Sequence, residues 1–210
     1  MAVVERVPLS RERIADTALR FIDNHGLDAL SMRKLGTELG VEAMSLYNHV
    51  ANKDDLLDSV SNRLYTRVLE AYGDPPGDWR AKARRMAASY VEVASAHPQA
   101  LPLLLSQSPE SPARLQFLDR VVTIFDDVTD DLRVAALAFA VVANWVVGTL
   151  VHQFDATSGD YIEPAVAGFE RVATFRRALL VEIGRKERFE EGLEVVLDGI
   201  AYRYFSANRF

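Results

Sequence analysis

Three side chains of one short segment, Tyr47, His49 and Lys53, can each donate a hydrogen bond to a phosphate oxygen. Tyr47 and His49 can do so without a full charge. The ammonium group of Lys53 lies beside a predicted helix start, where backbone N–H groups also attract anions. The segment therefore carries the donors that contact with a nucleic-acid backbone requires.

The residues just before these donors could face base edges. Ser45 can bond either type of base edge, while Ala43 and Met44 can contact the methyl group of thymine. Glu42 either accepts from a cytosine amino group or complements the helix dipole, and we favour the second role. A helical face that is polar and aromatic, with few formal charges, suits the major groove of DNA.

Residues 31–53 predict two short helices joined by a glycine turn. Ser31 is a suitable N-cap, and Gly36 leaves room for a second helix to cross closely. Gly40 tolerates the positive φ that the turn needs.

The second helix is predicted to run from Glu42 to His49 and to turn Leu46 and Val50 inward. A helix–glycine–helix pattern also fits an αα-hairpin of a helical bundle. The short turn, the short helices and the residues that follow favour a DNA-binding helix-turn-helix.

The run from Leu39 to Leu57 fits the pattern L-G-V-x-x-x-S-L-Y-x-H-V-x-N-K-x-x-L-L. Here the chain resembles the TetR family of one-component transcriptional regulators. The resemblance implies that base edges are faced by Glu42, Ala43, Met44 and Ser45. It implies that phosphates are contacted by Arg33, Lys34, Tyr47, His49 and Lys53, and Asn48 completes the predicted DNA-binding residues.

The composition is that of an ordinary globular protein: 210 residues, 49% hydrophobic and 26% charged, with room for two domains. The absence of cysteine excludes disulfides, thiolate metal sites and a cysteine nucleophile. The N-terminus lacks the apolar run of a signal peptide, so we expect a cytoplasmic protein.

The charge is unusual for a nucleic-acid-binding protein, because the formal net charge is −6. Residues 1–53 contain seven basic and seven acidic residues, so the excess of acid lies downstream. We therefore expect DNA binding to depend on a few well-placed cations and on helix N-termini, and to weaken moderately with salt.

Apolar residues recur at helical spacing along the chain, and no segment alternates as a β-strand does. The predicted fold is all-α: an N-terminal three-helix helix-turn-helix head and a C-terminal helical ligand-binding and dimerisation domain. Besides the helix-turn-helix, helices are predicted over residues 9–25, 52–72, 79–96, 98–106, 109–127, 134–151, 164–184 and 189–205. Ser10 and Asn52 are the expected N-caps of the first two. The expected domains are 1–53 (DNA binding), 54–78 (connecting helix and linker) and 79–210 (ligand binding and dimerisation).

Residues 134–151 form the most apolar run and reach the lower length limit for a membrane span. Asn144 interrupts the run, and alanines are numerous. We favour a helix that places one face on its own core and the other on a second subunit.

Motifs for catalysis are missing: the sequence has no G-x-S-x-G elbow, no H-E-x-x-H and no glycine-rich phosphate loop. We predict neither an enzyme nor a cofactor or metal site. His152 and Asp155 could together touch a ligand or cation, although each alone is more often an ordinary surface residue. The acidic group at 126–131 lacks the glycine of an EF-hand and is interpreted as helix capping.

The resemblance also implies a homodimer joined by the last long helices and an effector pocket among the central helices. Candidate pocket residues are Met86, Tyr90, Gln107, Phe117, Asn144, Trp145, His152 and Phe175; for most of them core packing is the alternative. Candidate dimer residues are Val141, Gly148, Val151, Leu193, Val196, Leu197, Ile200 and Tyr204.

Together these features predict a sequence-specific DNA-binding transcriptional regulator, with no role in a membrane. We expect a repressor that a small-molecule effector releases from a near-palindromic operator in double-stranded DNA. The alternative is a helical adaptor or sensor that has kept the head without binding DNA.

Overall fold

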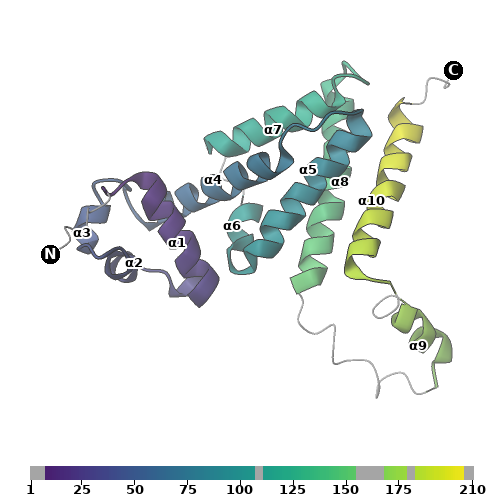
Figure 1. The fold of residues 1–210 in the computed structure, drawn as a ribbon. Helices are drawn as coiled ribbons and strands as arrows, with labels where there is room; N and C mark the ends of the chain where they lie inside the picture. The colour runs from purple at the N-terminus through teal and green to yellow at the C-terminus, as the bar shows by residue number, and fades with distance from the viewer. Residues whose placement is uncertain (1–7, 107–110, 155–167, 179–182, 206–210) are drawn as a thin grey trace. The chain divides into compact units, whose positions relative to one another are not determined.

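The computed structural model describes residues 8–106, 111–154, 168–178 and 183–205. Every regular element among them is helical, which confirms the all-α fold (Figure 1). The chain divides into two compact units, residues 1–74 with 92–120 and residues 75–91 with 121–210. These units differ from the expected domain boundaries, because the helix Leu101–Leu105 packs on the helix Lys53–Tyr72.

The first unit contains α1 (Arg11–His25), α2 (Met32–Leu39), α3 (Ala43–Leu46), α4 (Lys53–Tyr72), α6 (Leu101–Leu105) and most of α7 (Pro112–Phe125). The second contains most of α5 (Trp79–Ala96), α8 (Leu132–Phe154), α9 (Glu170–Arg177) and α10 (Arg185–Ile200), which continues as a π-helical turn over Ala201–Phe205. Single 3-10 turns occur at Leu27–Ala29 and Pro98–Ala100.

Polar caps set the helix starts in the first unit, as the sequence predicts. The side-chain oxygens of Ser10, Ser31 and Asn52 each accept a backbone N–H of the following first turn, at 3.2, 3.3 and 2.9 Å. These bonds satisfy donors that a helix start otherwise leaves unpaired. They fix where α1, α2 and α4 begin.

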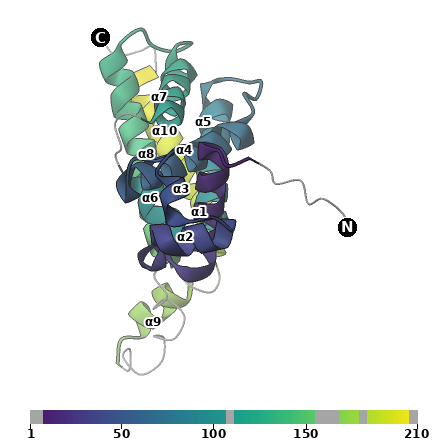
Figure 2. The same ribbon diagram turned by 90° about the vertical axis from the view of Figure 1, so that its left-hand side faces the viewer.

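The core of the first unit lies between α1 and α4. Ile14 and Ile22 of α1 and Leu56 and Val60 of α4 have no exposed surface. The hydroxyl group of Tyr65 on α4 donates to the carbonyl oxygen of Leu104 at 3.0 Å, which satisfies a free carbonyl at the end of α6. We call α1, α2 and α3 the head; they lie together beside the N-terminal end of α4 in both views (Figures 1 and 2).

In the second unit α8 and α10 run side by side (Figure 1). The ring of Trp145 on α8 fits against Gly192 of α10, where an added Cβ atom would come within 2.0 Å of the indole. At the end of the π-helical turn that follows α10, the ring centroid of Phe205 lies 5.1 Å from that of Trp79 in α5. Arg84 of α5 forms a bidentate ion pair with Glu194 of α10.

Several predicted ends shift. The helix predicted at 109–127 is seen from Pro112 to Phe125, with residues 107–110 outside the described chain. The helix predicted at 164–184 is seen only as α9, and the one predicted from Phe189 begins four residues earlier, at Arg185. Polar residues at 185–188 give no apolar signal, although they continue the helix.

Candidate nucleic-acid interface

The recognition segment is held by a small apolar core. Leu35 of α2 and Leu46 of α3 have no exposed surface, and Val50 after α3 is 1% exposed. The helix predicted over 42–49 is shorter than expected: α3 ends at Leu46, and Tyr47–His49 form a turn. The carbonyl of Leu46 accepts N–H groups from both His49 and Val50, at 2.9 and 3.0 Å. This turn lets Val50 reach the core.

Two glycines allow the close approach of α2 and α3. Gly40 ends α2 in the left-handed region, at φ 69° and ψ 32°. A Cβ atom on Gly36 would lie 2.9 Å from the carbonyl oxygen of Val41 and 3.2 Å from the backbone nitrogen of Ala43. Both contacts are with backbone, so the two helices could not keep this spacing around a large side chain. The predicted close crossing at Gly36 is confirmed.

The predicted base-reading residues lie on and just before α3. Met44 is 71% exposed, Ala43 and Ser45 are half-buried, and Glu42 is the exposed N-cap residue. The Glu42 side chain makes no hydrogen bond to the first turn of α3. Its preferred role at the helix dipole stays a prediction.

The predicted phosphate contacts surround this face. Arg33, Tyr47 and Lys53 are exposed, as is Asn48, and His49 is half-buried. Within the described residues, none of these side chains makes a hydrogen bond or an ion pair. Lys34 differs, because its ammonium group donates to the carbonyl oxygen of Ala29 at 2.9 Å. Apart from Lys34, the surface presents donors that the head itself does not use.

Asp55, in the first turn of α4, holds the recognition segment in place. Its carboxylate accepts the backbone N–H of Ala51 at 2.7 Å and forms an ion pair with Arg11 of α1. The Arg11 guanidinium, which also donates to the carbonyl oxygen of His49 at 3.2 Å, lowers the pKa of Asp55, and the Ala51 N–H lowers it further. Arg11 therefore braces the recognition segment from inside the head.

This geometry defines the class of protein. The short helix α3 packs on a small apolar core and crosses α2 closely at Gly36. It exposes Met44, and the hydrogen-bond donors around this side chain are mostly unpaired. That is the arrangement of a DNA-binding helix-turn-helix, in which the second helix enters the major groove.

The predicted pocket residues fall in both units. Phe117 is buried in the first unit with its ring 5.4 Å from that of Tyr65. In the second unit, Met86 is buried and Tyr90 is half-buried. Gln107 and the side chain of His152 lie outside the described residues, as does Asp155. A shared pocket stays a prediction.

Three of the pocket candidates have surroundings that differ from those of a pocket wall. Asn144 and Phe175 are exposed, the latter to 64%. Trp145 is half-buried against α10. In the part of the chain described, no three His, Asp or Glu side chains gather as a metal site would need.

The predicted dimer residues separate into two groups. Leu193, Leu197 and Ile200 are at most 3% exposed and face the core of their own subunit. Val141, Val151 and Tyr204 are exposed, and Gly148 and Val196 are partly exposed. Apolar residues of one helix can thus either pack in the subunit's own core or stay exposed for a second subunit. The periodicity of the sequence alone does not separate these two sets.

The helix α8 is long and apolar enough to cross a membrane over Leu132–Val151, and 22% of that stretch is buried inside the chain. Core helices of soluble proteins can be equally long and apolar. Its apolar surface needs a cover, either lipid or protein.

Comparison with known proteins decides the family. Residues 14–60 match the model of the bacterial regulatory proteins of the tetR family, and residues 73–204 match that of the tetracyclin repressor-like C-terminal domain. The repressor DrrR1 of Streptomyces coeruleorubidus is 27% identical over 91% of this chain and 77% of its own. The class D tetracycline repressor of Escherichia coli is 28% identical over 91% of this chain and 88% of its own.

Solved structures agree. ActR of Streptomyces coelicolor in complex with actinorhodin superposes with a TM-score of 0.78 at 27% identity, over 96% of this chain and 100% of that one. The chain belongs to the TetR family. It is a DNA-binding transcriptional regulator of the family whose members bind operator DNA, respond to small molecules and act as dimers.

Sequence reasoning missed two groups of the head and its surroundings. These groups are Asp55 and His97. Their partners lie 44 and 74 residues away in the sequence, so no local spacing could reveal them.

Proposed function

We propose that this regulator is a homodimeric repressor of a near-palindromic operator. The observation that carries the proposal is the exposed face around α3, whose donors, apart from Lys34, have no partner among the described residues. Two copies of α3 would enter successive major grooves about 34 Å apart, so the operator would consist of two inverted half-sites. DrrR1 and the tetracycline repressors, to which the chain is similar, are named as repressors.

Within this face we assign two tasks. Residues 42–45 would read base edges, and Arg33, Tyr47 and Lys53 would bind phosphates, with His49 and Lys34 beside them. Lys53 is the first residue of α4, so its ammonium group would act together with the free N–H groups of that helix. Few free cations surround the face, which fits the neutral charge of residues 1–53.

The dimer would form on the exposed stripe of α8. Leu137, Val141, Asn144, Gly148 and Val151 follow at spacings of four, three, four and three, which places them on one helical face. The side chains of Leu137, Val141 and Val151 are 42%, 44% and 53% exposed, respectively. A second subunit would cover this face, and Val195 and Tyr202, exposed to 72% and 67%, would extend it along α10. A protein cover for α8 agrees with a cytoplasmic regulator.

The effector would be a small molecule bound in the C-terminal part of the chain. ActR has been solved with actinorhodin and with (S)-DNPA, so actinorhodin and tetracycline are the first compounds to add. Binding would shift α4 and change the spacing of the two heads. By linkage, operator DNA must then weaken effector binding by the same factor. We assign no enzymatic activity.

The test measures affinity for duplexes selected from random DNA at several salt concentrations. Lys53→Ala should weaken binding and reduce the slope of log K against log salt by about 0.9, because one phosphate contact is lost. Tyr47→Ala should weaken binding with the slope unchanged, because its phenol carries no charge. Arg171→Ala removes an exposed cation of α9 and serves as the control. Unchanged affinity in both head variants would refute the phosphate assignments.

A further inference from the structure

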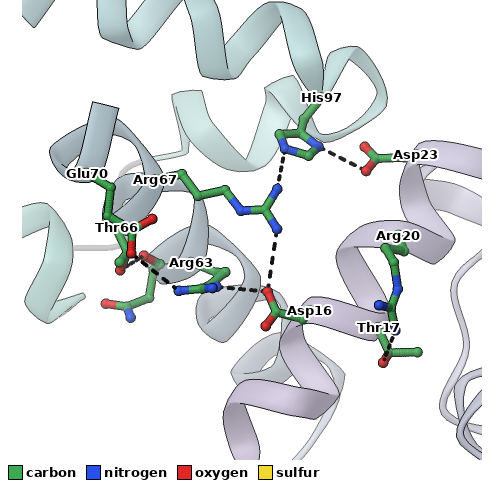
Figure 3. Close-up of polar contacts among 10 residues, drawn as sticks. Asp16, Thr17, Arg20, Asp23, Arg63, Thr66, Arg67, Glu70 and His97 are labelled. Carbon is green, nitrogen blue, oxygen red and sulfur yellow. Dashed lines mark hydrogen bonds and ion pairs between the residues drawn. The ribbon is translucent and has the colours of Figure 1, made fainter. Parts of the chain in front are cut away.

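A chain of polar contacts ties α1 of the head to α4 and to the end of α5. The imidazole of His97 lies between two charged groups, with Nδ1 2.9 Å from Oδ2 of Asp23 and Nε2 2.6 Å from an amino group of Arg67 (Figure 3). The other amino group of Arg67 lies 3.6 Å from Asp16. Asp16 also accepts from Nε of Arg63 at 2.8 Å. We call Asp23, His97, Arg67 and Asp16 the relay.

The chemistry of the partners fixes the proton on the imidazole. A guanidinium group can only donate, so Nε2 of His97 must accept from Arg67. Nδ1 therefore carries the hydrogen and donates to the carboxylate of Asp23. With the hydrogen assigned in this way, both nitrogens of His97 have a partner.

Asp23 depends on this single bond. Its second oxygen, Oδ1, is buried and accepts no hydrogen bond from any described residue. A carboxylate in that position needs its remaining partner. The head is thus held at two points of α1: at Asp23 through His97, and at Asp16 through Arg63 and Arg67 of α4.

We infer that His97 is a positioning residue for DNA binding, which sets the orientation of the head through Asp23. The inference rests on the proposed function. His97 directly follows α5, a helix that begins in the second unit and ends in the first. A displacement of its end reaches α1 through rigid, directional bonds. The relay does not touch the base-reading face, so it governs the spacing of the two heads rather than the recognition of one half-site.

Spacing selectivity tests this role, and general destabilisation would not change it. A selected operator is compared with versions that carry one base pair more or fewer at the centre. For the natural chain we expect at least a tenfold preference for the selected spacing. In His97→Leu, which removes both the acceptor for Arg67 and the donor to Asp23, the preference should fall at least threefold. Affinity for a single half-site should stay unchanged.

Asp23→Ala removes the same bond together with the carboxylate itself, so it leaves no unpaired charge and should fold if His97→Leu does not. It should lose spacing selectivity to the same extent. The control is His25→Leu, which makes the same change at an exposed histidine at the end of α1 outside the relay. The second readout is ¹⁵N NMR of labelled histidine, in which His97 should show the Nδ1–H tautomer without DNA.

Two outcomes overturn the inference. One is an Nε2–H or doubly protonated His97 in the folded protein. The other is an operator that is bound with full spacing selectivity by both relay variants. Failure to select any operator is different, because it contradicts the proposed function while the tautomer of His97 still reports on the relay.

Discussion

Met44 is the most exposed large apolar side chain among the described head residues, at 71%. An exposed thioether chain at the tip of α3 costs free energy in water and recovers it against an apolar group in the groove, which the thymine methyl supplies. We therefore expect at least one thymine in each half-site whose methyl group contacts Met44.

Replacing thymines by uracil one at a time tests this contact, because uracil lacks only the methyl group. At one or two positions the change should weaken binding by about 0.8 kcal/mol, roughly fourfold, the value of one buried methyl group. In Met44→Ala the same replacement should have no effect. Equal sensitivity to uracil in both proteins would rule out the contact.

Asp55 makes the stability of the head depend on pH. Its pKa is lowered in the folded state, first by Arg11 and then by the Ala51 N–H, so folding favours the charged carboxylate. The stabilisation is complete above the unfolded pKa of about 3.9 and is lost as the pH falls through the lower folded value. Asp55→Asn should cost about 1 kcal/mol at pH 7, and the difference from the natural chain should shrink towards pH 3.

Urea unfolding at the two pH values measures this difference. Asp58→Asn, on the exposed side of the same helix, is the control. A cost that is identical at pH 7 and pH 3 would show that the carboxylate charge plays no part.

Single residues show how far the sequence predicts the site. The caps Ser10, Ser31 and Asn52 act within three residues of their own position, and all three predictions are confirmed. The Arg11–Asp55 brace joins residues far apart in the chain. Many charged residues could pair with Arg11, and only the fold selects Asp55.

At the scale of elements, α3 can pack closely on α2 because the residue of α2 at the crossing is Gly36. Gly36→Leu should push α3 away, since the added atoms would meet the backbone of Val41 and Ala43. The expected cost is about 1–3 kcal/mol of stability, with loss of operator binding. Glu38→Leu, at an exposed position of α2, is the control and should retain both. Thermal unfolding and anisotropy measure the two effects, and an unimpaired Gly36→Leu protein would contradict the close crossing.

The pair of α8 and α10 depends on one glycine in the same way. Gly192→Ala would place a methyl group within 2.0 Å of the Trp145 ring, so we expect a loss of about 1–3 kcal/mol. Trp145→Phe in the same chain should recover part of it, because the smaller ring leaves room. Gly184→Ala adds a methyl group that meets nothing within 4 Å and is the control. A double variant no more stable than Gly192→Ala would refute the fit.

The sequence predicts where these helices lie in the chain better than which of their side chains are buried. Helical periodicity located α8 and α10, because both repeat apolar residues. It could not separate the side chains of α10 that pack on α8, such as Leu193 and Leu197, from those such as Val195 that are left exposed. Both sets are apolar, and only the packed chain distinguishes them.

At the scale of the whole molecule, the exposed α8 stripe predicts the oligomeric state. Val141→Glu and Val151→Glu would each bury a charge in the proposed interface, which destabilises a dimer strongly. We expect monomers in light scattering after size exclusion, with the helical content retained. Leu115→Glu, on an exposed position of α7, should stay dimeric. Dimeric Val141→Glu and Val151→Glu proteins would place the interface elsewhere.

Sequence-specific repression is tested most directly by selecting operators from random duplexes with the dimer of this chain, followed by anisotropy on the enriched sequences. We predict enrichment of a near-palindrome whose half-sites lie about one helical turn apart, and loss of affinity in Tyr47→Ala. If no sequence is enriched by the folded dimer, even after unfolding and refolding to remove any bound ligand, the chain is not a sequence-specific regulator and the adaptor alternative holds.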